Sequence, residues 1–172
     1  PDFNDIVDQA TGTIVKEVSG LKRMVDEFSK FARMPVPVMA RQSLHNALND
    51  VIALYKGAHR DVEFVTDLDE HLPWIMMDRE QMKRVFVNLF DNAVQAMNGK
   101  GCLWVTTRHE AREGRVVIEV VDEGVGIQPG DQENLFLPYF SKKKAGTGLG
   151  LAIVHRIISD HNGRIRAANH SP

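Results

Sequence analysis

Two asparagines four residues apart are the first side chains whose type and spacing indicate chemistry. Asn88 and Asn92 would lie one above the other on the same face of a helix, with Asp91 beside them. Their amide oxygens suit a hard, hexacoordinate cation such as Mg²⁺, which takes few protein oxygens together with waters and phosphates. A solvated polar helix face is the alternative explanation of this spacing.

A carboxylate and two glycines form the second cluster. Asp122, Gly124 and Gly126 come directly after the apolar stretch 116–121. An acid at a strand end can accept a hydrogen bond from an exocyclic amine, and glycines let the backbone approach a planar ligand. The cluster therefore suits an adenine pocket, while an ordinary turn with the same residues is the alternative.

Lysines and glycines form the third cluster, just before a predicted helix. Lys142, Lys143 and Lys144 lead into the glycine-rich segment from Gly146 to Gly150. Glycines expose backbone amides, the helix start adds partial positive charge and the lysines add full charges, so a polyphosphate would be held here. A flexible lysine-rich loop is the alternative. The spacing is neither the Walker pattern nor the dinucleotide-binding glycine pattern.

The elements that position these clusters follow from apolar periodicity and from helix and turn signals. Asp78 is the predicted N-cap of the helix that carries the asparagines, and Gln81 completes a pattern like a capping box. We predict helices over 42–55, 78–97 and 149–161, and strands over 61–66, 74–77, 103–109, 115–121 and 164–168. The nearly continuous apolar run of 116–121 is typical of a central strand. The predicted fold class is α/β, in layers.

The N-terminal stretch predicts one long helix. Residues 2–34 contain no proline, and an apolar residue recurs every seven positions from Val7 to Phe28. This seam favours a helical bundle across a dimer, and a single amphipathic helix packed on its own domain is the alternative. Pro35 and Pro37 end the helix and begin a short linker.

Length, composition and charge limit the class of protein. A chain of 172 residues fits one main domain with an attached segment, and 43% apolar with 26% charged residues is close to the globular average. The formal net charge of -2 provides no overall positive field for nucleic acid or an anionic membrane. The lone cysteine, Cys102, excludes an internal disulfide. No apolar run is long enough to span a bilayer, so we expect a cytosolic chain, although a piece of a longer membrane protein would look the same.

Taken in order, these segments resemble the ATP-binding domain of sensor histidine kinases, within the superfamily shared with gyrase, heat-shock chaperone and mismatch-repair ATPases. The similarity covers roughly residues 41–168, and the sequence of 146–163 is closest to nitrogen-regulation sensor kinases. The matching segments are Asn88 to Ala93 for the N box, Asp122 to Gly126 for the first glycine box, Phe136 to Phe140 for the F box and Gly146 to Leu151 for the second glycine box.

The resemblance implies a fold, a division into domains and a set of partners. The fold would be the two-layer α/β sandwich of the histidine kinase ATPases, the Bergerat fold, preceded by a long N-terminal helix. Residues 1–37 would be the second helix of the dimerisation and phosphotransfer hairpin plus a linker, and residues 38–172 the catalytic domain. The full-length protein would form a homodimer through that helix and act on a response regulator receiver domain. It would be cytoplasmic, or the cytoplasmic part of a membrane-anchored sensor, without nucleic acid or membrane contacts in this segment.

The resemblance also implies residue roles around ATP and Mg²⁺. Asn92 would ligate Mg²⁺, Asn88 would lie beside the phosphates and Asp122 would bind the adenine amine. Gly124 and Gly126 would shape the base pocket.

The remaining implied roles belong to a lid between residues 130 and 146. Phe136 and Phe140 would brace this lid. The segment implied to meet the phosphates comprises Gly146, Thr147, Gly148, Leu149 and Gly150, and the candidates for contact with the γ-phosphate are Lys142, Lys143 and Lys144.

Asn88 stands where the ATP-hydrolysing members of the superfamily carry a general-base glutamate. An amide cannot take a proton, whereas a neutral imidazole is already nucleophilic near pH 7, so transfer to histidine is favoured over hydrolysis. The acceptor histidine is not in this chain, because the only histidine followed by an acid, His109, lies at a predicted strand end. Two other functions stay open: a nucleotide-sensing module that controls a response regulator without kinase chemistry, and a coiled-coil scaffold that dimerises through residues 7–32.

Overall fold

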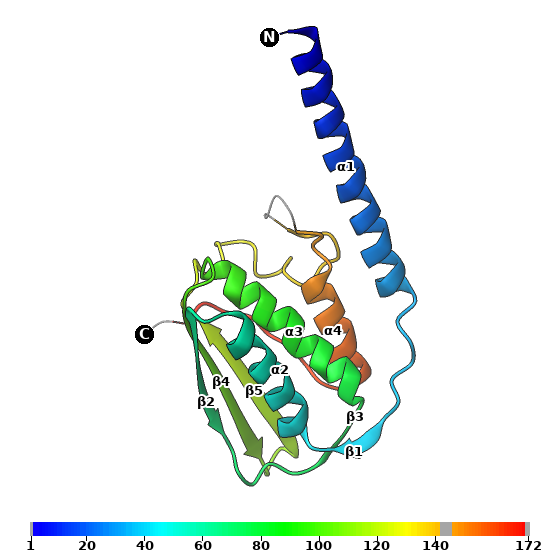
Figure 1. Ribbon diagram of the computed structural model, residues 1–172. Helices are drawn as coiled ribbons and strands as arrows, with labels where there is room; N and C mark the ends of the chain where they lie inside the picture. Colours follow the sequence, from blue (N-terminus) through cyan, green and yellow to red (C-terminus); the bar gives the residue numbers. More distant parts are fainter. Residues whose placement is uncertain (1, 142–145, 171–172) are drawn as a thin grey trace.

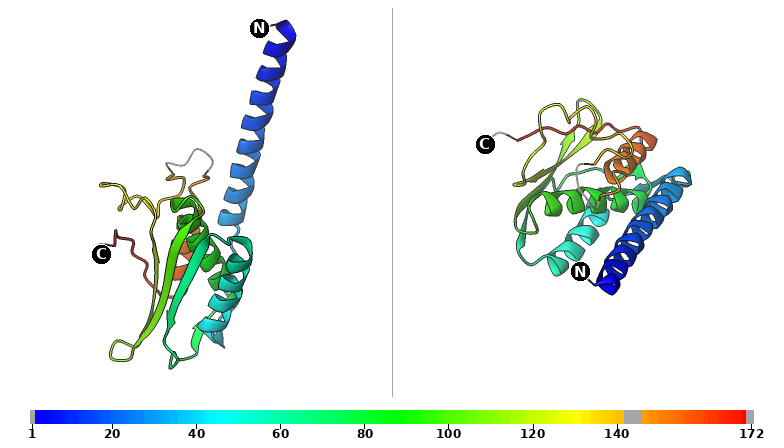
Figure 2. Two further views of the ribbon diagram at one scale, coloured as in Figure 1. Left: turned by 60° about the vertical axis from the view of Figure 1, so that its left-hand side comes forward. Right: turned by 90° about the horizontal axis from the view of Figure 1, so that it is seen from above.

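A long helix extends from an α/β body in the computed structural model, which describes residues 2–141 and 146–170 (Figure 1). Helix α1 (Phe3–Ala32) projects from the body, and its N-terminal end lies farthest from it (Figures 1 and 2). The remaining elements are β1 (Ala40–Gln42), α2 (Leu44–Ala58), β2 (Val62–Leu68), β3 (Ile75–Met77), α3 (Arg79–Ala96), β4 (Gly101–Glu110), β5 (Arg115–Asp122) and α4 (Gly150–Asp160).

The body consists of one layer of strands and one layer of helices. Strands β2, β4 and β5 form a mixed sheet in that order, with β2 and β4 parallel and β4 and β5 antiparallel. Helices α2, α3 and α4 cover one face of this sheet (Figures 1 and 2). A short antiparallel pair, β1 and β3, lies where the linker joins the body. The predicted two-layer α/β class with a preceding long helix is confirmed.

The core explains why α3 lies centrally in the helix layer. Phe86 and Phe90 of α3 are fully buried, and the Phe90 ring packs edge-on against Tyr55 of α2 and Phe64 of β2, at centroid distances of 5.4 and 5.5 Å. Edge-to-face pairs at this separation add specificity to the apolar burial that stabilises the core. The rotation of α3 about its axis is thereby set.

Two predictions about the sheet are wrong. The central strand is β4 and not β5, because β4 follows α3 as the parallel partner of β2 and then turns back through Gly114 into β5. The apolar run of β5 is only half-buried. Residues 164–168 form no strand: only Ile165 of this stretch packs on the core, and the segment has no regular secondary structure. The short strand β1 was not predicted.

The predicted N-cap of α3 is confirmed, and it also holds the linker. One carboxylate oxygen of Asp78 accepts a hydrogen bond from Gln81 N at 3.0 Å, and the other accepts from Val38 N at 2.8 Å. Burial acts to raise the pKa of Asp78, but the amides of Gln81, Val38 and Glu80 outweigh it and lower the pKa below its ordinary value. The ionised form is therefore the one that stabilises the fold.

We expect Asp78→Ala to lower the free energy of unfolding by about 1–2 kcal/mol at neutral pH, because the cap of α3 is lost. Since the folded pKa lies below the unfolded one, this contribution is complete above about pH 4 and disappears as the pH falls further. Urea unfolding at pH 7 and pH 3 should show the difference between the two proteins shrinking in acid. Asp78→Ser, which retains a capping oxygen, is the control, and an equal loss in that variant would contradict the capping role.

Candidate functional site

Asn88, Asn92 and Ala96 form one row along α3, because each stands four residues after the last. All three side chains are half-buried, in contrast to the fully buried Phe86 and Phe90. We refer to Asn88, Asn92 and Ala96 as the α3 row. Two other segments of the chain pack against it.

The start of α4 lies at the first two members of the α3 row. A methyl group placed on Gly150 would lie 3.0 Å from Oδ1 of Asn88 and 3.9 Å from Nδ2 of Asn92. Nδ2 of Asn88 donates to the carbonyl of Arg84 at 2.7 Å, so the amide is oriented with its oxygen toward α4. An acceptor oxygen and a helix N-terminus, with its unpaired amides, therefore face each other where glycine leaves room.

The turn after β5 lies at the third member of the row. Val125 N donates to the carbonyl of Ala96 at 3.3 Å, and a methyl group on Gly124 would lie only 2.5 Å from Ala96 Cβ. Asp122 Oδ1 accepts from Gly124 N at 2.8 Å, and the Asp122 side chain is exposed to solvent. The structure thus brings the asparagine cluster, the Asp122 turn and the start of α4 together along one helix.

The F-box segment packs against the middle of the second glycine box. Tyr139 N donates to the carbonyl of Gly148 at 3.0 Å, and a methyl group on Gly148 would lie 2.5 Å from the carbonyl carbon of Tyr139. Gly148 has φ +67°, where glycine is favoured. Phe136 and Phe140 are half-buried, and the Phe136 ring lies 5.8 Å from that of His155 on α4. This contact joins the predicted lid to α4.

Helix α1 also contacts this segment. The Phe28 ring lies 6.2 Å from the ring of Tyr139, between centroids. Tyr139 has φ +67°, which is uncommon for a bulky residue. Neither residue was predicted as part of the site. Tyr139 lies within the F box, so its position was available from the sequence, but its backbone conformation was not.

The other predicted residues divide into three groups. Gly126 follows the Asp122 turn with φ +69°, and Gly146 and Thr147 precede the start of α4. Leu149 is fully buried in the core, so only its backbone can reach a ligand. The three predicted lysines, Lys142, Lys143 and Lys144, lie outside the described residues.

Asp91 has a structural role, unlike the neighbouring Asn88 and Asn92. The buried Tyr55 hydroxyl lies 2.5 Å from Asp91 Oδ1 and 3.1 Å from the carbonyl of Val87. Burial, together with the neighbouring Asp91 carboxylate, raises the pKa of Tyr55, so the hydroxyl is the hydrogen donor at all ordinary pH values. Asp91 therefore joins α3 to α2.

The donor set of the α3 row fits a magnesium ion that is shared with phosphates. Among residues 2–141 and 146–170, no group of three His, Cys, Asp or Glu side chains could hold a metal by itself. The amide oxygen of Asn88 and the amide nitrogen of Asn92 lie beside the α4 N-terminus, around a space that a Cβ at Gly150 would partly fill. Mg²⁺ retains waters and phosphate ligands, so few protein oxygens suffice.

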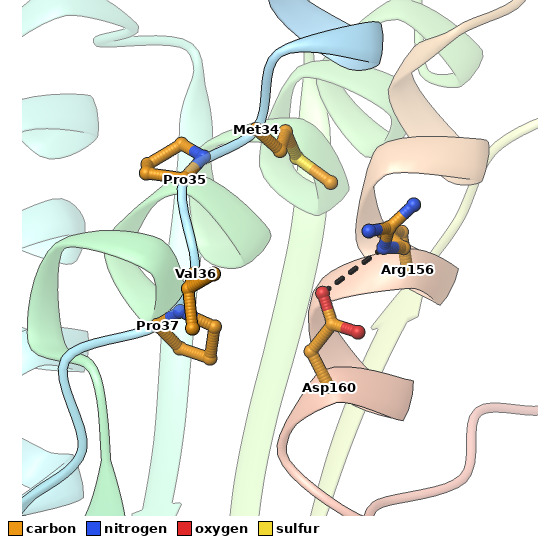
Figure 3. A pocket seen from close by; sticks show the side chains of 6 residues that line it. All are labelled: Met34, Pro35, Val36, Pro37, Arg156 and Asp160. Carbon is orange, nitrogen blue, oxygen red and sulfur yellow. Dashed lines mark hydrogen bonds and ion pairs between the residues drawn. The ribbon is translucent and has the colours of Figure 1, made fainter.

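Two hollows in the surface lie elsewhere. One of about 300 Å³ separates the linker from α4, where Arg156 Nε donates to Asp160 Oδ2 at 3.0 Å (Figure 3). The other, of about 230 Å³, lies beside it at the start of α3. Neither is lined by the predicted site residues, because both form where the linker crosses the ends of α3 and α4. The candidate site is identified by the convergence of three segments on the α3 row.

Comparison with known proteins finds relatives among bacterial regulatory proteins and histidine kinases. The nitrogen regulation protein NtrY of Azorhizobium caulinodans is 34% identical over 168 residues, which cover 94% of this chain and 21% of NtrY. The signal transduction histidine-protein kinase AtoS of Escherichia coli K12 is 33% identical over 158 residues, covering 91% of this chain and 26% of AtoS. The chain thus spans about a fifth to a quarter of the length of these curated relatives.

A solved structure and a family match agree with the architecture. The catalytic domain of histidine kinase ThkA superposes with a TM-score of 0.70 at 29% identity, covering 77% of this chain and 88% of that domain. The fold is therefore that of the histidine kinase ATPase domains. Residues 77–172, more than half of the chain, match the family described as histidine kinase-, DNA gyrase B-, and HSP90-like ATPase. The α3 row, the Asp122 turn and the start of α4 all lie within this match, and the chain belongs to that ATPase family.

Proposed function

We propose that this chain is the ATP-binding catalytic part of a sensor histidine kinase. It transfers the γ-phosphate of ATP to a histidine outside the chain, for relay to a receiver aspartate of a response regulator. The observation that carries this proposal is the α3 row, where an exposed carboxylate, paired amides and a helix N-terminus lie within three helical turns. The name of AtoS, a signal transduction histidine-protein kinase, supports a kinase of this type, and that of NtrY supports a regulatory role.

The Asp122 end of the site binds adenine. An exposed carboxylate beside a glycine turn can accept a hydrogen bond from the exocyclic amine of the base, which guanine lacks at that position. The turn lies flat against Ala96 because Gly124 has no side chain, so the base would have a surface of backbone to stack on.

The α4 end of the site binds the phosphates. Backbone amides around Gly146, Gly148 and Gly150 and the partial positive charge of the helix start favour an anion there. Asn92 would hold Mg²⁺, with Asn88 beside the phosphates. Bound Mg²⁺ would neutralise charge on the transferring phosphoryl group, as is usual in phosphoryl transfer. The lysines at 142–144 are further candidates for the γ-phosphate.

The site suits a nucleophile that does not need a general base. Asn88 already donates to the Arg84 carbonyl, and its amide oxygen cannot take up a proton at neutral pH. A water or hydroxyl nucleophile would have to lose a proton in the reaction, whereas a neutral imidazole attacks directly near pH 7. Histidine is therefore the acceptor that this arrangement favours.

Helix α1 provides the contact with a second copy. Its apolar residues Ile14, Val18 and Leu21 are each more than 60% exposed, and they recur at helical spacing. We assign residues 1–37 to the second helix of the dimerisation hairpin and its linker, and residues 38–172 to the catalytic domain. The full-length protein would be a homodimer, and this part of it would lie in the cytoplasm, either in a cytoplasmic protein or as the cytoplasmic part of a membrane-anchored sensor. Within the described part of the chain, no helix is long and apolar enough to cross a membrane.

Two experiments test the proposal. Calorimetry with the folded chain should show Mg²⁺-dependent binding of ATP and ADP. Absence of binding at millimolar nucleotide concentrations would contradict the proposed nucleotide pocket. Adding a full-length partner that carries the acceptor histidine, with Mg-ATP, should then place label on histidine. Tight ATP binding without any label would instead indicate a nucleotide-sensing module that controls its response regulator without kinase chemistry.

The close packing of Gly124 gives a prediction for this site. Gly124→Ala would put a methyl group 2.5 Å from Ala96 Cβ and 2.8 Å from the Ala96 carbonyl carbon, so the turn must move away from α3. We expect ATP affinity to fall at least tenfold by calorimetry. Gly57→Ala on α2 is the control, since a methyl group there meets nothing within 4 Å. Equal ATP affinity in both variants would mean that the turn does not shape the pocket.

A further inference from the structure

The backbone just beyond the Asp122 turn is held by a side chain from the other end of the domain. Asn169 Oδ1 accepts a hydrogen bond from Ile127 N at 2.7 Å, and Asn169 Nδ2 donates to the carbonyl of Ile127 at 2.9 Å. One side-chain amide thus satisfies both backbone groups of one residue, as a neighbouring strand would. The two residues are 42 positions apart in the sequence.

Gly126 makes room for this contact. A methyl group on Gly126 would lie 3.0 Å from Asn169 Oδ1, and the residue has φ +69°. A side chain at this position would therefore be strained in its backbone and would also press on the Asn169 amide. Glycine at position 126 therefore serves two needs: it allows the positive φ of the turn, and it leaves space for the Asn169 side chain.

Three contacts together fix the loop from Asp122 to Ile127. The first joins Asp122 Oδ1 to Gly124 N within the turn, and the second joins Val125 N to the carbonyl of Ala96 on α3. Both lie at the beginning and middle of the loop. The Asn169 contact holds its far end, from which the chain continues toward the F box.

From this arrangement we infer that Asn169 is a positioning residue of the base pocket, holding the Gly126–Ile127 backbone at the spacing from Asp122 that an adenine ring requires. The inference rests on the proposed function, because it assigns this loop to the base. Asn169 would touch no ligand itself. Its effect on binding would come from a loop that is already in place before the nucleotide arrives.

The test compares Asn169→Ala with Arg166→Ala in the same chain. Arg166 is also an exposed residue of the segment after α4, and it is not among the partners of the loop described above. We expect Asn169→Ala to weaken binding of adenosine, ADP and ATP by the same factor, roughly tenfold, since two hydrogen bonds of the loop are lost. Arg166→Ala should bind all three like the unmodified chain. Hydrogen exchange should show faster exchange of the Ile127 amide only in Asn169→Ala.

Each outcome decides between explanations. Unchanged affinity in Asn169→Ala, with faster Ile127 exchange, would show that Asn169 only fastens the chain end, and would overturn the inference. A fall in ATP affinity without a fall in adenosine affinity would place the effect at the phosphates and also overturn it. Asn169→Asp keeps the acceptor for Ile127 N but sets a carboxylate against the Ile127 carbonyl, so it should not restore binding. If the unmodified chain binds no adenine nucleotide, the proposed function itself fails, which is a separate result.

Discussion

Asp122→Ala should lower the affinity for ATP at least 100-fold while the domain stays folded. Asp122 is exposed at the end of β5, so its removal leaves the core unchanged. The variant loses the acceptor for Gly124 N in the turn and also the charged acceptor that we propose for the adenine amine. Losing a specific polar partner in a binding site typically costs two or more orders of magnitude in discrimination. Calorimetry with ATP and GTP, alongside thermal unfolding, would measure both expectations.

Asp122→Asn separates the two parts of this effect. Asparagine keeps an oxygen for Gly124 N but places an NH₂ donor where the second carboxylate oxygen stands. We therefore expect a correctly formed turn that still discriminates poorly between ATP and GTP. Retained preference for ATP in either variant would contradict the assignment of Asp122 to the base.

Asn92→Ala should reduce phosphoryl transfer at least 100-fold, with a smaller change in the affinity for the adenosine part of the nucleotide. Asn92 lies on the α3 row beside the start of α4. The Asp122 turn packs one helical turn further along α3, at Ala96. Loss of its amide would remove the ligand that we propose for Mg²⁺, and this ion supplies much of the charge neutralisation in phosphoryl transfer. Label transfer to a native partner, measured at increasing Mg²⁺ concentrations, should require more Mg²⁺ for half-maximal transfer in the variant than in the unmodified chain.

Asn92→Asp is the matched variant, because it keeps oxygen ligands and adds a charge. We expect impaired transfer. The Mg²⁺ concentration for half-maximal transfer should fall in Asn92→Asp, whereas it rises in Asn92→Ala, since a carboxylate binds a cation more tightly than an amide does. Unchanged transfer in both variants with a native partner would count against the magnesium role of Asn92.

The contact between Phe28 and Tyr139 joins α1 to the F box. Tyr139 is bonded through its amide to Gly148, and Gly148 stands two residues before the start of α4 at Gly150. A shift of α1 relative to the body would therefore act on the segment that we propose to border the phosphates. In this structure, the helix assigned to dimerisation thus contacts the F box, although β1, α2, β2 and β3 separate α1 from α3 along the chain.

Local signals were enough to predict the elements that carry the site. Helix α3 begins after the confirmed N-cap Asp78, and Asn98 and Gly99, both with positive φ, follow its C-cap Met97. Capping and termination depend on residues within a few positions of one another, so both were predictable. The order of the three clusters along the chain, read as a family pattern, likewise predicted the fold class.

Contacts between distant segments were decided only by the folded chain. The apolar run of β5 indicated a central strand, yet the pairing of β2 with β4 through the α3 crossover made β4 central. The meeting of Gly150 with Asn88, of Gly124 with Ala96, and of Asn169 with Ile127 has no local signal, since each joins residues at least 28 positions apart. Helix ends and turns depend on neighbouring residues and can be read along the chain. Packing between elements depends on the complementarity of whole surfaces, which exists only once the sheet and its helices have come together.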